Sequence, residues 1–233
     1  MSRKKIKKKK LKMRLRKTHL LIILKAAVVI LILISFFVPW YHDYTFTSNN
    51  ESWETDWYLQ SYYVTHKNTS VNTEMRYSYP GPDNLHNASI VWNTTFYLTI
   101  LTSVVAISSL LYDIKVKKPK RNIGIILELI SLFCILSVVC YFLVSYPDAI
   151  AEDAKNISTQ NPCITNHGST KAFFAVISDG ISGNWAPSYG YFIMIGALII
   201  YLFIVEHRIR IALGKVYLRM LDEAERLREA ERK

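Results

Sequence analysis

Four apolar segments separated by polar sequence constrain the fold of this chain more than any other feature. They cover residues 20–40, 90–112, 123–146 and 189–205. Each is close to the ~20 residues that a helix needs to cross the ~30 Å hydrocarbon layer of a membrane. Backbone polar groups find no water inside lipid, so each segment is expected to be helical, and residues 185–188 offer an extension of the short fourth one. The sequence therefore predicts an all-α membrane protein with a bundle of four transmembrane helices.

Lysine and arginine are distributed very unevenly along the 233 residues, whose formal net charge is +11. Twenty-five of the 29 basic residues lie in residues 1–19, at Lys25, in the 113–122 connection and in the 206–233 tail. The loops 41–89 and 147–188 hold only four. Because basic loops stay in the cytoplasm, we expect a cell-membrane protein with both termini inside and the two long loops outside. The positive charge is then explained by the orientation of the chain in the membrane, and nucleic acid is not expected as a partner.

The first outside loop has the composition of β-strands. Aromatic and β-branched residues dominate the runs 57–65 and 74–79, with turn-like sequence at 66–70 between them and a Pro-Gly-Pro-Asp stop at 80–83. This pattern predicts a small antiparallel β cap over the helices. Its aromatic side chains are expected to form the core of the cap, the alternative being a surface for a partner.

The second outside loop and the two ends add further elements. Residues 147–155 are expected to extend the third helix, and the apolar stretch 171–177 to pack on the cap or lie at the membrane interface. The basic segment 1–19 should attract anionic lipid. The tail 206–233 is predicted to be a cytoplasmic amphipathic helix with one apolar stripe, which would lie on the membrane or meet another chain: Leu213, Tyr217, Met220, Ala224 and Leu227.

Two charged residues lie inside the apolar segments. Lys25 and Glu128 each follow the inner end of their segment by five residues, so both should lie ~8 Å deep on the cytoplasmic side. Because ionisable groups in a membrane are costly and usually face a partner or water, we expect the two to pair. The alternatives are that Lys25 reaches the cytoplasmic surface by itself and that Glu128 lies on an ion path.

Other residues that could be modified are scattered along the chain. The sequons at Asn50, Asn68, Asn87 and Asn156 are candidate glycosylation sites of the outside loops.

Nothing in the sequence fixes a catalytic site. There is no glycine-rich phosphate loop, no HExxH motif and no cysteine pair with metal spacing, so neither enzyme activity nor a cofactor or metal is expected. The outside histidines are interpreted as solvated loop residues: His42, His66, His86 and His167.

Three tryptophans carry a family resemblance. Trp40 closes the first segment, and Trp53 and Trp57 follow in the outside loop. With four spans and a β-rich first loop, the chain resembles the claudin and peripheral-myelin-protein group of tetraspan proteins. That group has a Trp after span one, then a Gly-Leu-Trp motif and two cysteines. Trp57 matches the motif Trp, but Thr-Asp replaces Gly-Leu, Gln60 stands at the first cysteine and no second one follows in the loop.

The resemblance implies adhesion or partner organisation, without the stapling disulfide of that group. We therefore expect a non-catalytic scaffold, adhesion or accessory subunit whose partners are membrane lipids and other membrane proteins or a second copy. The alternative is a small transporter or channel subunit with Glu128 on its path.

Overall fold

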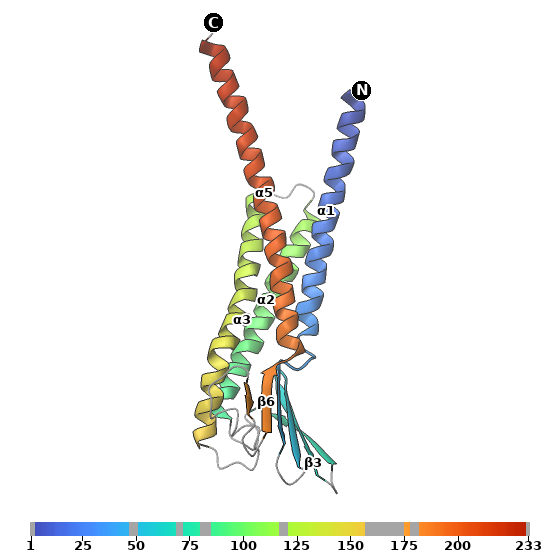
Figure 1. Ribbon diagram of the computed structural model, residues 1–233. Helices are drawn as coiled ribbons and strands as arrows, with labels where there is room; N and C mark the ends of the chain where they lie inside the picture. Colours follow the sequence, from blue (N-terminus) through green and yellow to red (C-terminus); the bar gives the residue numbers. More distant parts are fainter. Residues whose placement is uncertain are drawn as a thin grey trace.

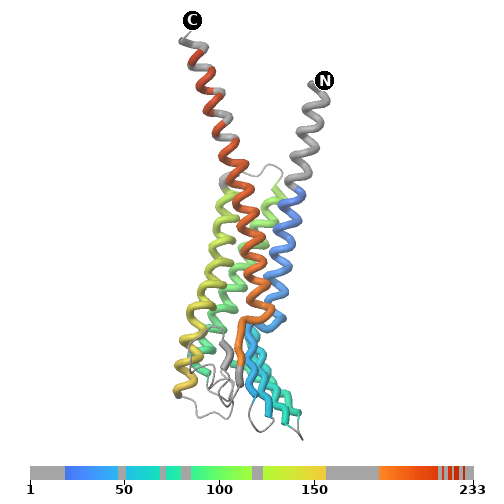
Figure 2. The backbone as a smooth tube through the Cα atoms, in the orientation of Figure 1, coloured from blue at the N-terminus to red at the C-terminus, as the bar shows by residue number. Residues whose placement is uncertain are grey.

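The computed structural model describes residues 3–46, 51–68, 72–79, 85–116, 121–156, 175–177 and 182–231. Four long helices lie side by side, and a small antiparallel sheet stands at one end of them (Figure 1). The first and last helices extend past the others at the opposite end, where the second long helix ends and the third begins (Figures 1 and 2). The chain is thus mostly helical, and the strands that the structure describes gather at one end of the helices.

The helices are α1 (Arg3–Ile34), α2 (His86–Lys115), α3 (Arg121–Asn156) and α5 (Tyr189–Glu231). Among the described residues, three stretches are long and apolar enough to cross a membrane: His86–Lys115, Ile123–Lys155 and Tyr189–Gly214. The described apolar part of α1, His19–Ile34, is shorter than these.

The helices pack as a square. In the described part of the chain α1 and α3 each pack on both α2 and α5, so α1 faces α3 across the bundle and α2 faces α5. The buried side of α1 follows helical spacing through Leu21, Lys25, Val28 and Ile32. Lys25 therefore points into the bundle because it occupies a position of the apolar stripe.

The sheet has the strand order β4-β3-β2-β1-β6-β5, and all its pairs are antiparallel. Its strands are β1 (Tyr41–Phe46), β2 (Ser52–Trp57), β3 (Ser61–Lys67), β4 (Asn72–Ser78), β5 (Ala175–Ile177) and β6 (Ser182–Pro187). Alternate residues of β1 are buried, since one face of a sheet covers the core and the other meets solvent. We call this sheet the cap.

The first apolar segment is not helical throughout, which corrects the expectation for residues 20–40. The helix ends at Ile34 and tightens into turns, in which the N–H of Phe37 donates to the carbonyl of Ile34 (2.9 Å). Pro39, which lacks an N–H and restricts the residue before it, then prevents the helix from resuming. Trp40 instead starts the cap: its backbone N–H donates to the carbonyl of Trp57 (2.7 Å) and its indole Nε1 to that of Ser35 (2.7 Å).

A second correction concerns residues 185–188, predicted as a helical extension. Trp185 to Pro187 belong to β6, which pairs with β1, and α5 begins only at Tyr189. The backbone N–H of Ser188 donates to the carbonyl of Trp40 (2.9 Å), so the chain passes directly from strand to helix.

The remaining expectations about secondary structure fare better. Antiparallel strands in the first outside loop are confirmed, although the run 57–65 is two strands with a turn in which the N–H of Tyr58 donates to the carbonyl of Ser61 (2.8 Å). The helical extension at 147–155 is confirmed, and so is a helical tail, which continues α5 without interruption. Of the stretch 171–177, residues 175–177 form β5, and residues 80–83 lie outside the described part.

Candidate functional site: a charge cluster across the bundle

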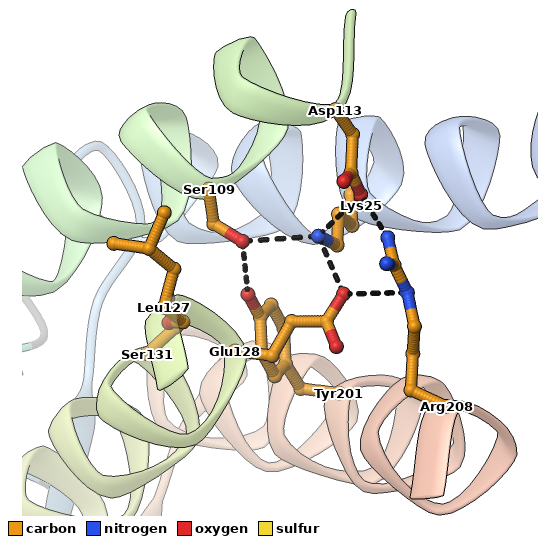
Figure 3. A network of polar contacts seen from close by, with 8 residues as sticks. All are labelled: Lys25, Ser109, Asp113, Leu127, Glu128, Ser131, Tyr201 and Arg208. Carbon is orange, nitrogen blue, oxygen red and sulfur yellow. Dashed lines mark hydrogen bonds and ion pairs between the residues drawn. The ribbon is translucent and has the colours of Figure 1, made fainter. Parts of the chain in front are cut away.

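Each of these four helices places one charged side chain inside the bundle (Figure 3). These are Lys25 of α1, Asp113 of α2, Glu128 of α3 and Arg208 of α5, which we call the charge cluster. The four side chains lie near the end away from the cap, because Asp113 is two residues before the end of α2 (Figure 1). The side chains of Lys25 and Glu128 are each 1% exposed, that of Asp113 is 4% exposed and that of Arg208 is 19% exposed. A buried ion is tolerated only when it is paired, so the geometry of these pairs decides what the cluster does.

The four groups form a closed ring of alternating charge. Lys25 Nζ lies 2.6 Å from Glu128 Oε1 and 2.7 Å from Asp113 Oδ2. Arg208 completes the ring, with Nε 3.1 Å from Glu128 Oε1 and Nη2 in contact with Asp113 Oδ2. Two of these contacts cross the diagonals of the square, α1 to α3 and α2 to α5, and two join neighbouring helices. The ring therefore links every helix to two others, and its net charge is zero.

Two neutral hydroxyl groups extend the cluster (Figure 3). Lys25 Nζ donates to Ser109 Oγ (3.0 Å), and the hydroxyl of Tyr201 donates to the same oxygen (3.3 Å). Ser109 lies one helical turn before Asp113 on α2, so both face the bundle. Neither oxygen of Glu128 meets the geometry of a hydrogen bond among the described residues, so this carboxylate is compensated by the ion pairs of Oε1 with Lys25 and Arg208.

The structure brings Lys25 and Glu128 together, as the matched depths in the sequence suggested. Sequence reasoning missed Asp113 and Arg208, because it placed them in the cytoplasmic connection and tail. Both lie just beyond an apolar segment, where the helices α2 and α5 continue. The spacing of four residues from Ser109 to Asp113 was the available signal, since it keeps both on one helix face.

The three tryptophans of the cap do not share one environment. Trp40 and Trp57 are fully buried, and Trp57 Nε1 donates to the buried carboxylate of Asp43. Trp53 is only partly buried and stacks on His66 with ring centroids 4.0 Å apart. Trp40 and Trp57 thus belong to an aromatic core that joins the cap to the helices, as expected for the cap aromatics.

His42 and His66 are strand residues, so their interpretation as solvated loop histidines is wrong. His42 Nδ1 lies 2.9 Å from Asp56 Oδ1 on the neighbouring strand. This hydrogen bond raises the pKa of His42 above its ordinary value, against the opposing effect of partial burial.

The four candidate glycosylation sites lie in different parts of the chain. The amide Nδ2 of Asn87, the atom that would carry a glycan, donates to Asp153 Oδ1 (2.9 Å). Asn68 follows β3 and is partly buried, and Asn156 is the last residue of α3. Asn50 lies outside the described residues.

Fold and site together define a mostly helical protein that has three helices suited to a membrane, a small antiparallel cap and a buried charge cluster. No protein-family model matches the chain, and no curated protein matches it in sequence. The resemblance to the claudin group stays a prediction.

Proposed function

We propose that the chain is a four-span membrane protein with the cap outside and both termini in the cytoplasm. The asymmetry of basic residues supports this orientation. The arrangement supports it as well, because the cap strands gather at one end of the helices and the outer ends of α1 and α5 lie at the other (Figure 1). The shorter apolar part of α1 is included because it packs on α2 and α5 and carries Lys25 into their shared interior.

Within that membrane protein we propose a non-catalytic role as scaffold or accessory subunit. The closed charge cluster is the observation that carries this proposal. A carboxylate that relays protons or ions needs access to water and a changing set of partners, whereas Glu128 is held by both Lys25 and Arg208. Such a balanced ring fixes the positions of four helices relative to one another, a role for which buried polar groups are best attested.

Two cavities lie among the described residues. One of about 570 Å³ lies between the cap and the helix ends, lined by residues such as Phe36 and Tyr63. The other, of about 330 Å³, lies between α1 and α5 and is lined by residues such as Leu24 and His207. None of the four charged groups lines either of these two cavities.

The surfaces left for partners lie at both ends of the bundle. Outside, the cap presents its solvent-facing strand residues. Inside, α5 continues as a helix whose apolar stripe is exposed, with Leu213, Tyr217 and Met220 each more than 60% accessible. This end would meet lipid, another membrane protein or a second copy of the chain, as the amphipathic pattern indicates.

Proton flux distinguishes this proposal from the transporter alternative. The chain and its Glu128→Gln variant would be reconstituted in liposomes that contain a pH-sensitive dye, and a pH gradient would be imposed. A scaffold gives the same dye response as protein-free liposomes with either chain. Flux in the unchanged chain that Glu128→Gln abolishes would establish the alternative. Glu206→Gln is the matched control, because Glu206 is an exposed residue of α5 whose partner is Arg210.

Partner recovery tests the positive side of the proposal. Cross-linking in the host membrane should recover the same proteins with the unchanged chain and with a folded Glu128→Gln variant. Recovery should fall when exposed residues of the α5 stripe, such as Leu213 and Tyr217, are replaced by serine. Recovery that depends on Glu128 in a folded variant, and not on the stripe or the cap, would contradict a scaffold role for these surfaces.

A further inference from the structure

Three side chains that could bind a metal converge on the solvent-facing side of the cap. His42 lies on β1, and Glu54 and Asp56 lie on β2. Their nearest ligand atoms all lie within 4.8 Å of one another. Each of the three is partly buried, with side-chain exposures of 32% for His42 and 36% for each carboxylate.

Strand geometry explains the convergence. Residues two apart on a strand face the same side, which places both carboxylates of β2 on one face. The register pairs His42 with Asp56, so the imidazole stands directly across from one carboxylate and diagonal to the other. Its Nδ1 lies 2.9 Å from Asp56 Oδ1, and its Nε2 lies 4.0 Å from Glu54 Oε1.

A structural cross-strand pair would need only one carboxylate. A second carboxylate brings the like charges of Glu54 and Asp56 together, which is unfavourable unless a cation offsets them. Lys67 is a nearby cation, with Nζ 3.8 Å from Glu54 Oε2, but its side chain is more than half exposed and it approaches a different oxygen from the one nearest the imidazole. Two carboxylates and one imidazole therefore lie together, with one ligand atom of each within 4.8 Å of the others.

We propose that His42, Glu54 and Asp56 bind a divalent transition-metal ion of the zinc class. Zinc accepts imidazole and carboxylate ligands at about 2.0–2.2 Å, and in open sites it keeps three protein ligands and a water. That geometry needs ligand atoms about 3.4 Å apart around one imidazole nitrogen. The carboxylates of Asp56 and Glu54 now lie nearest different nitrogens of His42, so metal binding requires these partly exposed side chains to rotate toward one of them. Calcium prefers six to eight oxygen ligands, so it does not match this set.

The ion would join β1 to β2 in a cap whose strands contain no cysteine. Because the site is formed by cap residues alone, it does not depend on the charge cluster or on the proposed scaffold role. Metal binding to the folded state would also raise the melting temperature of the chain.

Zinc titration of the full-length, tag-free chain in mild detergent tests the proposal, with a chromophoric chelator as competitor. We expect one zinc ion per chain, retained in excess calcium. Affinity should fall at least about tenfold in His42→Gln and in Glu54→Gln. It should rise about two- to fivefold in Lys67→Gln, because a competing cation is removed. Thermal melting should shift upward with zinc in the unchanged chain and not in His42→Gln.

Matched controls lie on the same cap. His66→Gln removes the other partly buried cap histidine, and Glu74→Gln removes a carboxylate of β4 exposed at the sheet edge. Both should bind zinc as the unchanged chain does. Circular dichroism of each variant shows whether it is folded, and Glu54→Gln serves if His42→Gln is not. The proposal is overturned if the unchanged chain shows no saturable zinc binding, if Glu54→Gln leaves the zinc affinity unchanged, or if His66→Gln lowers the affinity as much as His42→Gln does.

Discussion

Replacing Lys25 with methionine removes one cation from the charge cluster and keeps the length of the side chain. The two carboxylates, Asp113 and Glu128, then share Arg208 as their only ionic partner among the four cluster residues, and the cluster has a net charge of −1. Lys25 is 1% exposed, so water cannot easily replace the lost contacts.

The geometry sets the size of the effect. At the 2.6 Å between Lys25 Nζ and Glu128 Oε1, the attraction is about 6 kcal/mol for an effective dielectric constant of about 20. The desolvation of each ion, which costs several kcal/mol, offsets much of this in the intact protein. Removing one partner leaves the other charge buried, so Lys25→Met should lower the free energy of unfolding by about 3–5 kcal/mol.

A second substitution tests the cause. Glu128→Gln in the Lys25→Met background restores neutrality, because Asp113 and Arg208 remain as a pair. The double variant should be more stable than the sum of the single losses predicts, by about 1–3 kcal/mol. Unfolding in mixed detergent micelles, followed by tryptophan fluorescence and circular dichroism, measures all four free energies of the cycle.

The control is Glu206→Gln, which removes an exposed carboxylate two residues before Arg208. It should change stability by less than about 1 kcal/mol, as exposed pairs do. Plain additivity of Lys25→Met and Glu128→Gln would refute the reasoning, since independent losses mean that the two side chains do not compensate each other.

Two further predictions concern the junction of helices and cap. A Cβ at Gly190 would lie 2.3 Å from Trp40 Cδ1, so Gly190→Ala should cost about 1–3 kcal/mol in thermal unfolding. Gly196→Ala, where nothing lies within 4 Å, should be neutral on the same helix, and equal losses would contradict the close packing. Asp153 accepts hydrogen bonds from the first N–H groups of α2 (2.9 and 2.7 Å), so Asp153→Ala should cost about 1–2 kcal/mol in chemical denaturation. Glu152→Ala, at the adjacent exposed residue, is the control. A loss of similar size in this variant would show that the hydrogen bonds from the first N–H groups of α2 to Asp153 are not responsible.

The helices were predictable because their evidence is local. An apolar segment in a polar chain has to satisfy its own backbone, so the second, third and fourth segments are helices. Local evidence fails at the segment ends. Charged residues such as Asp113 and Arg208 end an apolar segment without ending the helix, so the sequence hid half of the charge cluster.

The presence of strands could be predicted from the sequence, but their pairing and register could not. Aromatic and β-branched runs indicate strands wherever they occur, yet register depends on partners distant in the chain. β6 pairs with β1 across more than 130 residues, and its last residues adjoin an apolar segment, which made them resemble a helix. The convergence of His42 with Asp56 likewise follows from register alone.

The proposed topology has four helices, α1 included, that cross the membrane with the cap outside. Single cysteines introduced as Ser2→Cys, Ser78→Cys and Lys233→Cys in a variant without native cysteines would test it, with a membrane-impermeant maleimide added to intact cells. Ser78 is an exposed residue of the cap, so Ser78→Cys alone should react before the membrane is permeabilised, and all three afterwards. Reaction of Ser2→Cys in intact cells, with Lys233→Cys protected, would mean that α1 does not cross and would contradict the account.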